Sequence, residues 1–187
     1  MKLPPGIVFV RMERPQLEGF PQSPLPEPFR LRWYRPGDEE HWLAIHRQAE
    51  HIIEVTPALF EEFFGGAHRE QLPERQCYLI DAEERPIATA TAWFDNDYRG
   101  GRWGRVHWVA VAPRMQRQGL SKPLLSITLE RMQQLGHDRV YLRTSTARIP
   151  AINLYAQFGF VPALHNEDDR NIWRRINPRL KRPFELE

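Results

Sequence analysis

The sequence has little cysteine and no long apolar run. Cys77 is the only cysteine among 187 residues, so an intrachain disulfide is excluded and a cysteine-based metal site is not expected. It lies in the strand-like run 76–80, where we expect a buried, unreactive thiol. The N-terminal apolar run 7–10 is too short for a signal-peptide core or a membrane span. By default these absences predict a cytoplasmic protein with no membrane partner and no metal.

A strong excess of one charge is also missing. The chain has 26 Lys and Arg against 24 Asp and Glu, which leaves a formal net charge of +2. We therefore expect no nucleic-acid partner, because such binding usually needs a clear positive excess. The hydrophobic share of 41% and the charged share of 27% are typical of a globular protein, and the length fits one domain.

Proline, by contrast, is concentrated at the N-terminus. Seven of the 17 prolines fall within residues 1–28. Such a segment cannot form a helix and is a poor candidate for a central strand. We interpret it as an extended arm, with a flexible tail as the alternative. The predicted organisation is this arm at 1–28, a globular domain at 29–180 and a C-terminal tail at 181–187.

The rest of the chain alternates between strand and helix patterns. Alternating or apolar runs predict strands at 29–34, 76–81, 87–94, 105–112, 140–142, from 160 onward and at 171–176. Helical spacing and end signals predict helices at 38–51, 58–64, from 121 to 135 and at 151–158. Three of the strands form a meander joined by short turns. The order predicts an α+β fold, a mixed and mostly antiparallel sheet with helices on its faces.

The stretch 106–125 reads as a buried strand, a basic loop and the start of an amphipathic helix. Such a helix N-terminus can hold an anion, because unpaired N–H groups and the positive end of the helix dipole meet there. Gly119 can adopt a positive φ, and Ser121 can cap the helix. Arg114 and Arg117 add positive charge. Taken alone, a single glycine in a basic turn is more often an ordinary turn than a phosphate site.

Two segments resemble those of one enzyme family. Residues 116–121, Gln-Arg-Gln-Gly-Leu-Ser, resemble the pyrophosphate loop (Gln/Arg-x-x-Gly-x-Gly/Ala) of the GCN5-related N-acetyltransferase (GNAT) superfamily. Residues 151–160 begin Ala-Ile-Asn-Leu-Tyr and end Gly-Phe, which is similar to the second signature of these enzymes. The two occur in the right order with a strand between them, and the resemblance covers roughly residues 29–177.

The resemblance implies a V-shaped cleft for acetyl-coenzyme A between two parallel central strands, 106–112 and 140–144. Pantetheine would bond to the main chain at Val109, Ala110 and Val111. The pyrophosphate would lie on the amides of Gln116, Arg117, Gln118, Gly119, Leu120 and Ser121. Tyr155 would lie near the thioester sulfur and protonate the departing thiolate.

The implied reaction is direct acyl transfer from the thioester to a primary amine of a small molecule or a protein. An amine with a pKa of about 10.4 must first lose a proton. His107, on the central strand, is our candidate base; alternation places it with Val109 and Val111, where the alternative is a packed, hydrogen-bonded histidine. His51 and the glutamate pair 61–62 are further alternatives.

Three positions depart from the family pattern. Ser121 ends the loop where members usually have a small residue, a mild change that leaves its N–H available. Arg143 stands where some members carry a glutamate base, and Arg148 stands where an asparagine often begins the second signature. Both changes put a carboxylate mechanism in doubt and leave a catalytically inactive, coenzyme A-binding regulatory or structural domain as the alternative function. The two cations favour an acidic acceptor or the cofactor's phosphates, or they pair with carboxylates. The acceptor's identity and a homodimer are left open.

Overall fold

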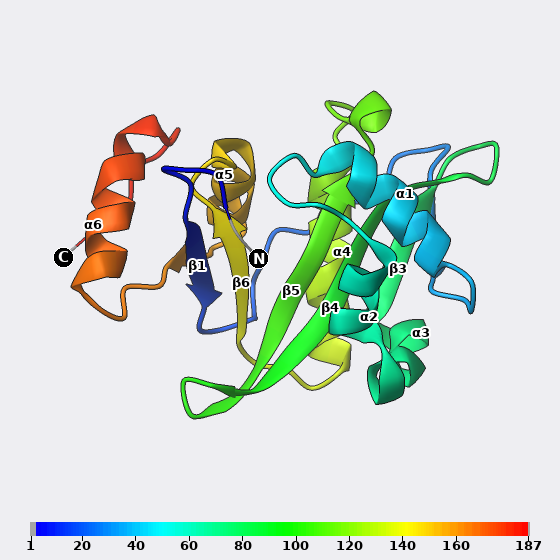
Figure 1. Cartoon of the computed structure of the whole chain (residues 1–187), viewed down its shortest axis with the longest axis horizontal. Helices are drawn as coiled ribbons and strands as arrows, with labels where there is room; N and C mark the ends of the chain where they lie inside the picture. Colours follow the sequence, from blue (N-terminus) through cyan, green and yellow to red (C-terminus); the bar gives the residue numbers. More distant parts are fainter. Residues whose placement is uncertain (1–2, 187) are drawn as a thin grey trace.

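A single seven-stranded sheet, in the order β2-β3-β4-β5-β6-β1-β7, organises the computed structural model, which describes residues 3–186 (Figure 1). Its strands are β1 Phe9–Arg14, β2 Arg30–Trp33, β3 Gln76–Ile80, β4 Pro86–Tyr98, β5 Gly101–Val111, β6 Val140–Ser145 and β7 Val161–Pro162. Every neighbouring pair is antiparallel except β5 and β6, which are parallel. The predicted α+β class, with its mixed and mostly antiparallel sheet, is therefore confirmed.

Helices cover both faces of this sheet. They are α1 Glu39–Ala49, α2 Pro57–Phe64, α3 Leu72–Arg75, α4 Ser121–Gln134, α5 Ile149–Gln157 and α6 Glu167–Ile176, with short 3-10 turns at Gly66–Gln71, Pro113–Met115 and Asn177–Arg179. In Figure 1, α1 and α2 lie in front of β4 and β5, and α4 lies behind them. None of the helices within residues 3–186 is long and apolar enough to cross a membrane.

Local end signals explain α2 better than they explain α1 and α4. Thr56 caps α2 as its sequence predicts, its hydroxyl accepting a hydrogen bond from the Leu59 amide at 3.1 Å. Asp38 does not cap α1, because its carboxylate instead accepts bonds from the Arg32 guanidinium. Ser121 does not cap α4 either; the helix begins at Ser121 itself, after Leu120. The amides at the start of α4 are thus left without a side-chain cap.

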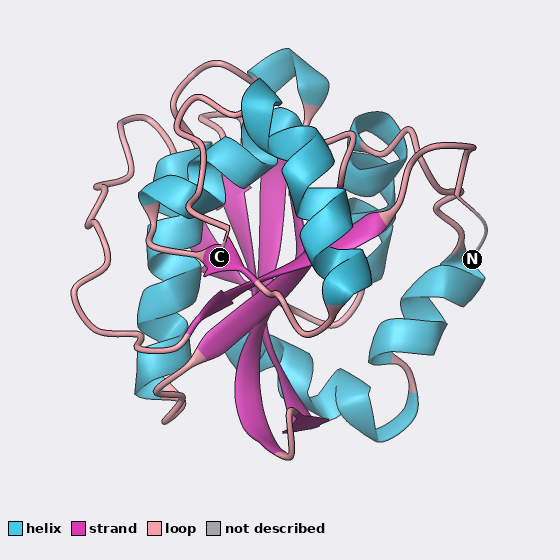
Figure 2. Cartoon of the chain, turned by 90° about the vertical axis from the view of Figure 1, so that its left-hand side faces the viewer, coloured by secondary structure: helices cyan, strands magenta, loops and turns pink. Residues whose placement is uncertain are grey.

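The N-terminal segment contributes a strand that the sequence did not lead us to expect. β1 lies next to β6 (Figure 1), between β6 and β7, and pairs antiparallel with both, within a sheet that has helices on both sides (Figure 2). No proline interrupts the chain between Pro5 and Pro15. The stretch therefore has all its backbone donors for the ladder, and Val10 and Met12 are buried in the core.

The strand expected at 171–176 is also wrong, since this segment is the second half of α6. Asn166 caps the helix by accepting a hydrogen bond from the Asp169 amide at 2.9 Å. Acidic residues fill the first turn and basic residues the last, which complements the helix dipole. Trp173 and Ile176 bury one face of the helix against the core.

The parallel pair β5–β6 separates along its length. The two strands pair only at Gly104–Val140, Arg105–Tyr141 and Val106–Leu142. Beyond Val106 they diverge, as Figure 1 shows, and no strand within residues 3–186 pairs with the β5 edge that faces β6 up to Val111. The expected V-shaped opening between the parallel strands is present.

Candidate active site

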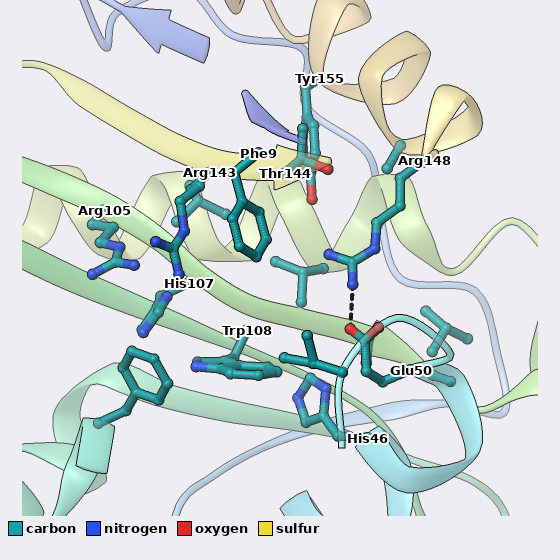
Figure 3. Close-up of a pocket in the computed structure, with 18 of the residues that line it drawn as sticks. Phe9, His46, Glu50, Arg105, His107, Trp108, Arg143, Thr144, Arg148 and Tyr155 are labelled. Atoms are coloured by element: carbon teal, nitrogen blue, oxygen red, sulfur yellow. Dashed lines mark hydrogen bonds and ion pairs between the residues drawn. The ribbon is translucent and has the colours of Figure 1, made fainter. Parts of the chain in front are cut away.

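A cavity of about 220 Å³ lies where β5 and β6 separate (Figure 3). Its floor is the stretch of β5 from Arg105 to Val111. Polar side chains of its wall include Arg143 and Thr144 of β6, Tyr155 of α5, His46 of α1, and Glu50, which directly follows α1. The opening thus combines the backbone of β5 with ionisable side chains from several elements.

A β-bulge at Trp108 decides which side chains of β5 enter this cavity. Thr89 is opposite Ala110 while Thr91 is opposite His107, so two residues of β5 face one residue of β4. Trp108 has a positive φ of 48° at the bulge. As a result His107 and Trp108 both face the aromatic residues of α1 and α2. The expectation that His107 shares a face with Val109 and Val111 is wrong, because the bulge breaks the alternation on which it depended.

Tyr155 extends from α5 into the cavity (Figure 3). The side chain is only 9% exposed, and its ring packs edge-on against Phe160 with the centroids 6.0 Å apart. Burial raises the pKa of its hydroxyl to about 12, although Arg148 partly opposes this shift. The hydroxyl is therefore protonated at neutral pH and is able to donate a proton.

His107 lies in the same cavity, its ring 5.0 Å from that of Phe63 and 5.7 Å from that of Phe64. Burial lowers the pKa of His107 well below its usual value, and the nearby Arg105 and Arg143 lower it further. The imidazole is therefore neutral at pH 7 and has a free lone pair, but it is a weak base.

His46 was not singled out by the sequence, yet it lines the same cavity. Its ring lies 4.4 Å from that of Trp42 and 5.0 Å from that of Trp108. Burial lowers the pKa of His46 to about 3, against a smaller opposing effect of a hydrogen bond with the Trp108 backbone.

Among residues 3–186, three histidines are buried, His46, His107 and His137, and burial lowers the pKa of each, which predicts acid sensitivity of the fold. Below about pH 6.5 the unfolded chain binds protons at these positions while the folded chain does not, so stability falls as the pH falls. We expect each of His46 and His107 to lower the free energy of unfolding by about 1.4 kcal/mol per pH unit between about pH 6.5 and 5. Urea titrations followed by tryptophan fluorescence would measure the slope.

His46→Gln should remove one histidine's share of that slope, whereas His51→Gln, at an exposed position, should leave it unchanged. A slope that is the same in His46→Gln and in the unmodified protein would contradict this account.

The loop between β5 and α4 presents unused backbone donors. Arg117 and Gly119 both have positive φ, 64° and 79°, and alternate with residues of ordinary backbone conformation. Within residues 3–186, the amides from Arg117 to Leu120 donate no hydrogen bond to the protein. Successive free amides in this conformation, next to the N-terminus of α4, form a concave site for an anion.

Arg148 and Arg143 have different surroundings. Arg148 forms an ion pair across the cavity with Glu50, the residue that follows α1 (Figure 3), which is the carboxylate pairing left open by the sequence. Glu50 also accepts a hydrogen bond from the Ile52 amide at 2.7 Å. Arg143 forms no ion pair in the described part of the chain and lies over the Phe9 ring at 4.3 Å.

The other suggested bases lie outside this cavity. His51, Glu61 and Glu62 are exposed and do not line it, and Glu61 pairs with Arg69 instead. The sequence did not indicate Glu50 or Arg105 as site residues. The spacing of His46 and Glu50, four residues apart at the end of α1, is a local signal for Glu50 only, and nothing near Arg105 in the sequence marks it.

Comparison with solved structures shows the fold to be that of the GCN5-related N-acetyltransferases. A member from Sphaerobacter thermophilus superposes with a TM-score of 0.67 at 18% identity, over 86% of this chain and 50% of that one. In the NatC complex bound to Gag peptide and CoA, one chain superposes with a TM-score of 0.59 at 20% identity, over 71% of this chain and 84% of that one.

The model of the Acetyltransferase (GNAT) family matches residues 13–160, and the chain belongs to this family. A mycothiol acetyltransferase of Pseudarthrobacter chlorophenolicus is 30% identical over 144 residues, which are 75% of this chain and 45% of the relative. The chain spans about half the length of the curated relatives it matches.

Proposed function

We propose that the chain is an acetyl-coenzyme A-dependent N-acetyltransferase that acylates a primary amine of a small molecule or a protein. The observation that carries the proposal is the cleft itself. It has an anion-binding loop of free amides at one end and a buried, protonated tyrosine within it. Membership of the GNAT family and relatives named mycothiol acetyltransferase support acetyl transfer, and the latter favour a small-molecule acceptor.

The residues of the cleft fit the donor. The free amides from Arg117 to Leu120, together with the positive end of α4, suit a pyrophosphate, whereas the Gln116 amide already donates a hydrogen bond to the Pro113 carbonyl at 3.2 Å. The unpaired edge of β5 at Val109, Ala110 and Val111 offers main-chain groups to the amides of pantetheine, as an added strand would use them. When bound, acetyl-coenzyme A supplies an activated acyl group at its thioester.

In this proposal, one side chain donates a proton to the leaving group and another accepts a proton from the amine. The Tyr155 hydroxyl donates its proton to the leaving thiolate, since its pKa of about 12 keeps it protonated at neutral pH. The neutral His107 accepts the proton that the amine loses. The enclosed cavity holds the amine next to the thioester, so that positioning supplies part of the rate.

A panel of amines incubated with acetyl-coenzyme A and analysed by mass spectrometry tests the proposal. The panel contains small polar amines, amino acids and peptides with free N-termini, and coenzyme A replaces acetyl-coenzyme A in the control. We expect an acetylated product from at least one amine, dependent on the thioester. Tight coenzyme A binding with no acetylated product from any amine would instead establish the inactive binding domain.

A further inference from the structure

Three arginines from neighbouring strands lie together on the face of the sheet that bounds the cavity. Arg11 of β1 is directly opposite Arg143 of β6, and Arg105 of β5 is opposite Tyr141, two residues before Arg143. Cross-strand partners and residues two apart share a face of a sheet, so all three side chains are on one side. Arg105 and Arg143 line the cavity and converge near His107 (Figure 3).

These guanidinium groups have no ionic partner of their own. None of the three forms an ion pair within residues 3–186, and Nε of Arg105 is buried without a hydrogen-bond partner. The guanidinium groups of Arg105 and Arg143 lie over rings, 5.8 Å from the centre of Tyr141 and 4.3 Å from that of Phe9. Burial is the main cause that lowers the pKa of both arginines. For Arg143, repulsion by Arg105 and Arg11 lowers the pKa further against a smaller effect of Tyr141 and Glu62; for Arg105, Tyr141 and Asp95 oppose the shift and Arg11 adds to it.

The carboxylates on the same part of the sheet are already engaged elsewhere. Asp95 accepts a hydrogen bond from the Tyr141 hydroxyl at 2.8 Å. Glu13 accepts bonds from the Tyr98 hydroxyl at 2.7 Å and from Arg99 at 2.9 Å. Arg148, by contrast, is paired with Glu50, so Arg105 and Arg143 are the arginines of the cavity lining that have no ion pair within residues 3–186.

This end of the cavity is not the phosphate end. Arg105 and Val111 are six residues apart on β5, which corresponds to about 20 Å of strand. The loop of free amides begins beyond Val111, so the pyrophosphate and the arginine pair are at opposite ends of the cleft. The guanidinium groups therefore face the place left for the acceptor.

We propose that the acceptor is a small primary amine that carries an anionic group, a carboxylate or a phosphate ester, and that this group binds Arg105 and Arg143. The inference rests on the proposed acetyltransferase function. Planar guanidinium groups bind both kinds of anion through paired hydrogen bonds, and Arg11 adds to the positive field. Phe9 and Phe63 supply apolar walls for the carbon chain of a small molecule.

Matched acceptor pairs test this inference. 4-Aminobutyrate is compared with butylamine, and phosphoethanolamine with ethanolamine, so that the two arms separate a carboxylate from a phosphate. We expect kcat/KM to be about 10- to 100-fold higher for the anionic member of at least one pair. Arg105→Gln or Arg143→Gln should reduce that preference by a similar factor. Arg102→Gln, an exposed charge on the same strand outside the cavity, should not.

Calorimetric titration of the coenzyme A-saturated protein with the same four compounds separates the inference from the function on which it rests. Anionic compounds that bind through the two arginines without being acetylated would uphold the anion site and reject the enzyme. If the anionic and the neutral member of each pair have the same affinity and the same kcat/KM, the anion site is overturned. Acetylation of the neutral amines in that case still upholds the enzyme. An unchanged preference for the anionic acceptors in the double variant Arg105→Gln and Arg143→Gln would also overturn the anion site. Unchanged coenzyme A affinity shows that each variant is folded.

Discussion

Gly119→Glu is expected to weaken coenzyme A binding by more than 100-fold. The new carboxylate would lie among the free amides from Arg117 to Leu120, where the proposed pyrophosphate binds. Two like charges 4 Å apart repel by about 4 kcal/mol at an effective dielectric constant of 20, which corresponds to more than a 100-fold change in affinity. Isothermal titration calorimetry with coenzyme A measures the effect directly.

Gly119→Gln is the matched control, because it has the same size and backbone cost without the charge. A Cβ added at Gly119 has no other atom within 4 Å, so a steric clash of this Cβ does not explain the expected loss of coenzyme A affinity. The φ of 79° costs any L-residue about 1–2 kcal/mol of local strain. We expect the glutamine variant to retain much of the affinity. Equal losses in both variants would indicate strain rather than charge, and undiminished affinity of Gly119→Glu would reject the loop as the phosphate site.

Tyr155→Phe is expected to lower kcat by about 100- to 10,000-fold, the usual contribution of a positioned general acid. The ring keeps its packing against Phe160, and the hydroxyl bonds to no group in the described chain, so fold and coenzyme A affinity should change little. Steady-state kinetics with a saturating acceptor and calorimetry with coenzyme A separate the two quantities.

The pH profile provides a second measure of the same role. Because burial raises the pKa of Tyr155 to about 12, its deprotonation should reduce turnover only as the pH approaches that value. Tyr98→Phe is a suitable control, since it removes a partly buried hydroxyl that bonds to Glu13 and lies outside the cavity lining. An unaltered kcat in Tyr155→Phe would remove this residue from the mechanism.

Features encoded by neighbouring residues were well predicted. Thr56 followed by Pro57 marks the start of α2 because cap and first-turn chemistry act within one helical turn. The single helix after the basic loop and the helix that carries Tyr155 follow from apolar spacing and flanking glycines. The buried Cys77, whose pKa is raised to about 12 by burial, also matches its strand-like context.

Features that depend on distant partners were not predicted. β1 is a strand because β6 and β7 provide hydrogen bonds on both sides, and its short proline-free sequence does not reveal this. The segment 171–176 contains too few residues to distinguish a helix from a strand without the Asn166 cap that precedes it. The bulge at Trp108 has no glycine to mark it, so the face of His107 was misassigned.

The sequence by itself determined the proposed donor side of this protein. The loop from Gln116 to Ser121 and the segment around Tyr155 are each continuous in the chain, so their patterns can be recognised without a fold. Only the tertiary structure decided the proposed acceptor side. Arg105 and Arg143 come together because β5 and β6 are neighbours that separate beyond Val106, and Arg11 joins them because β1 pairs with β6. Sheet order, which no local pattern encodes, is the physical reason for the difference.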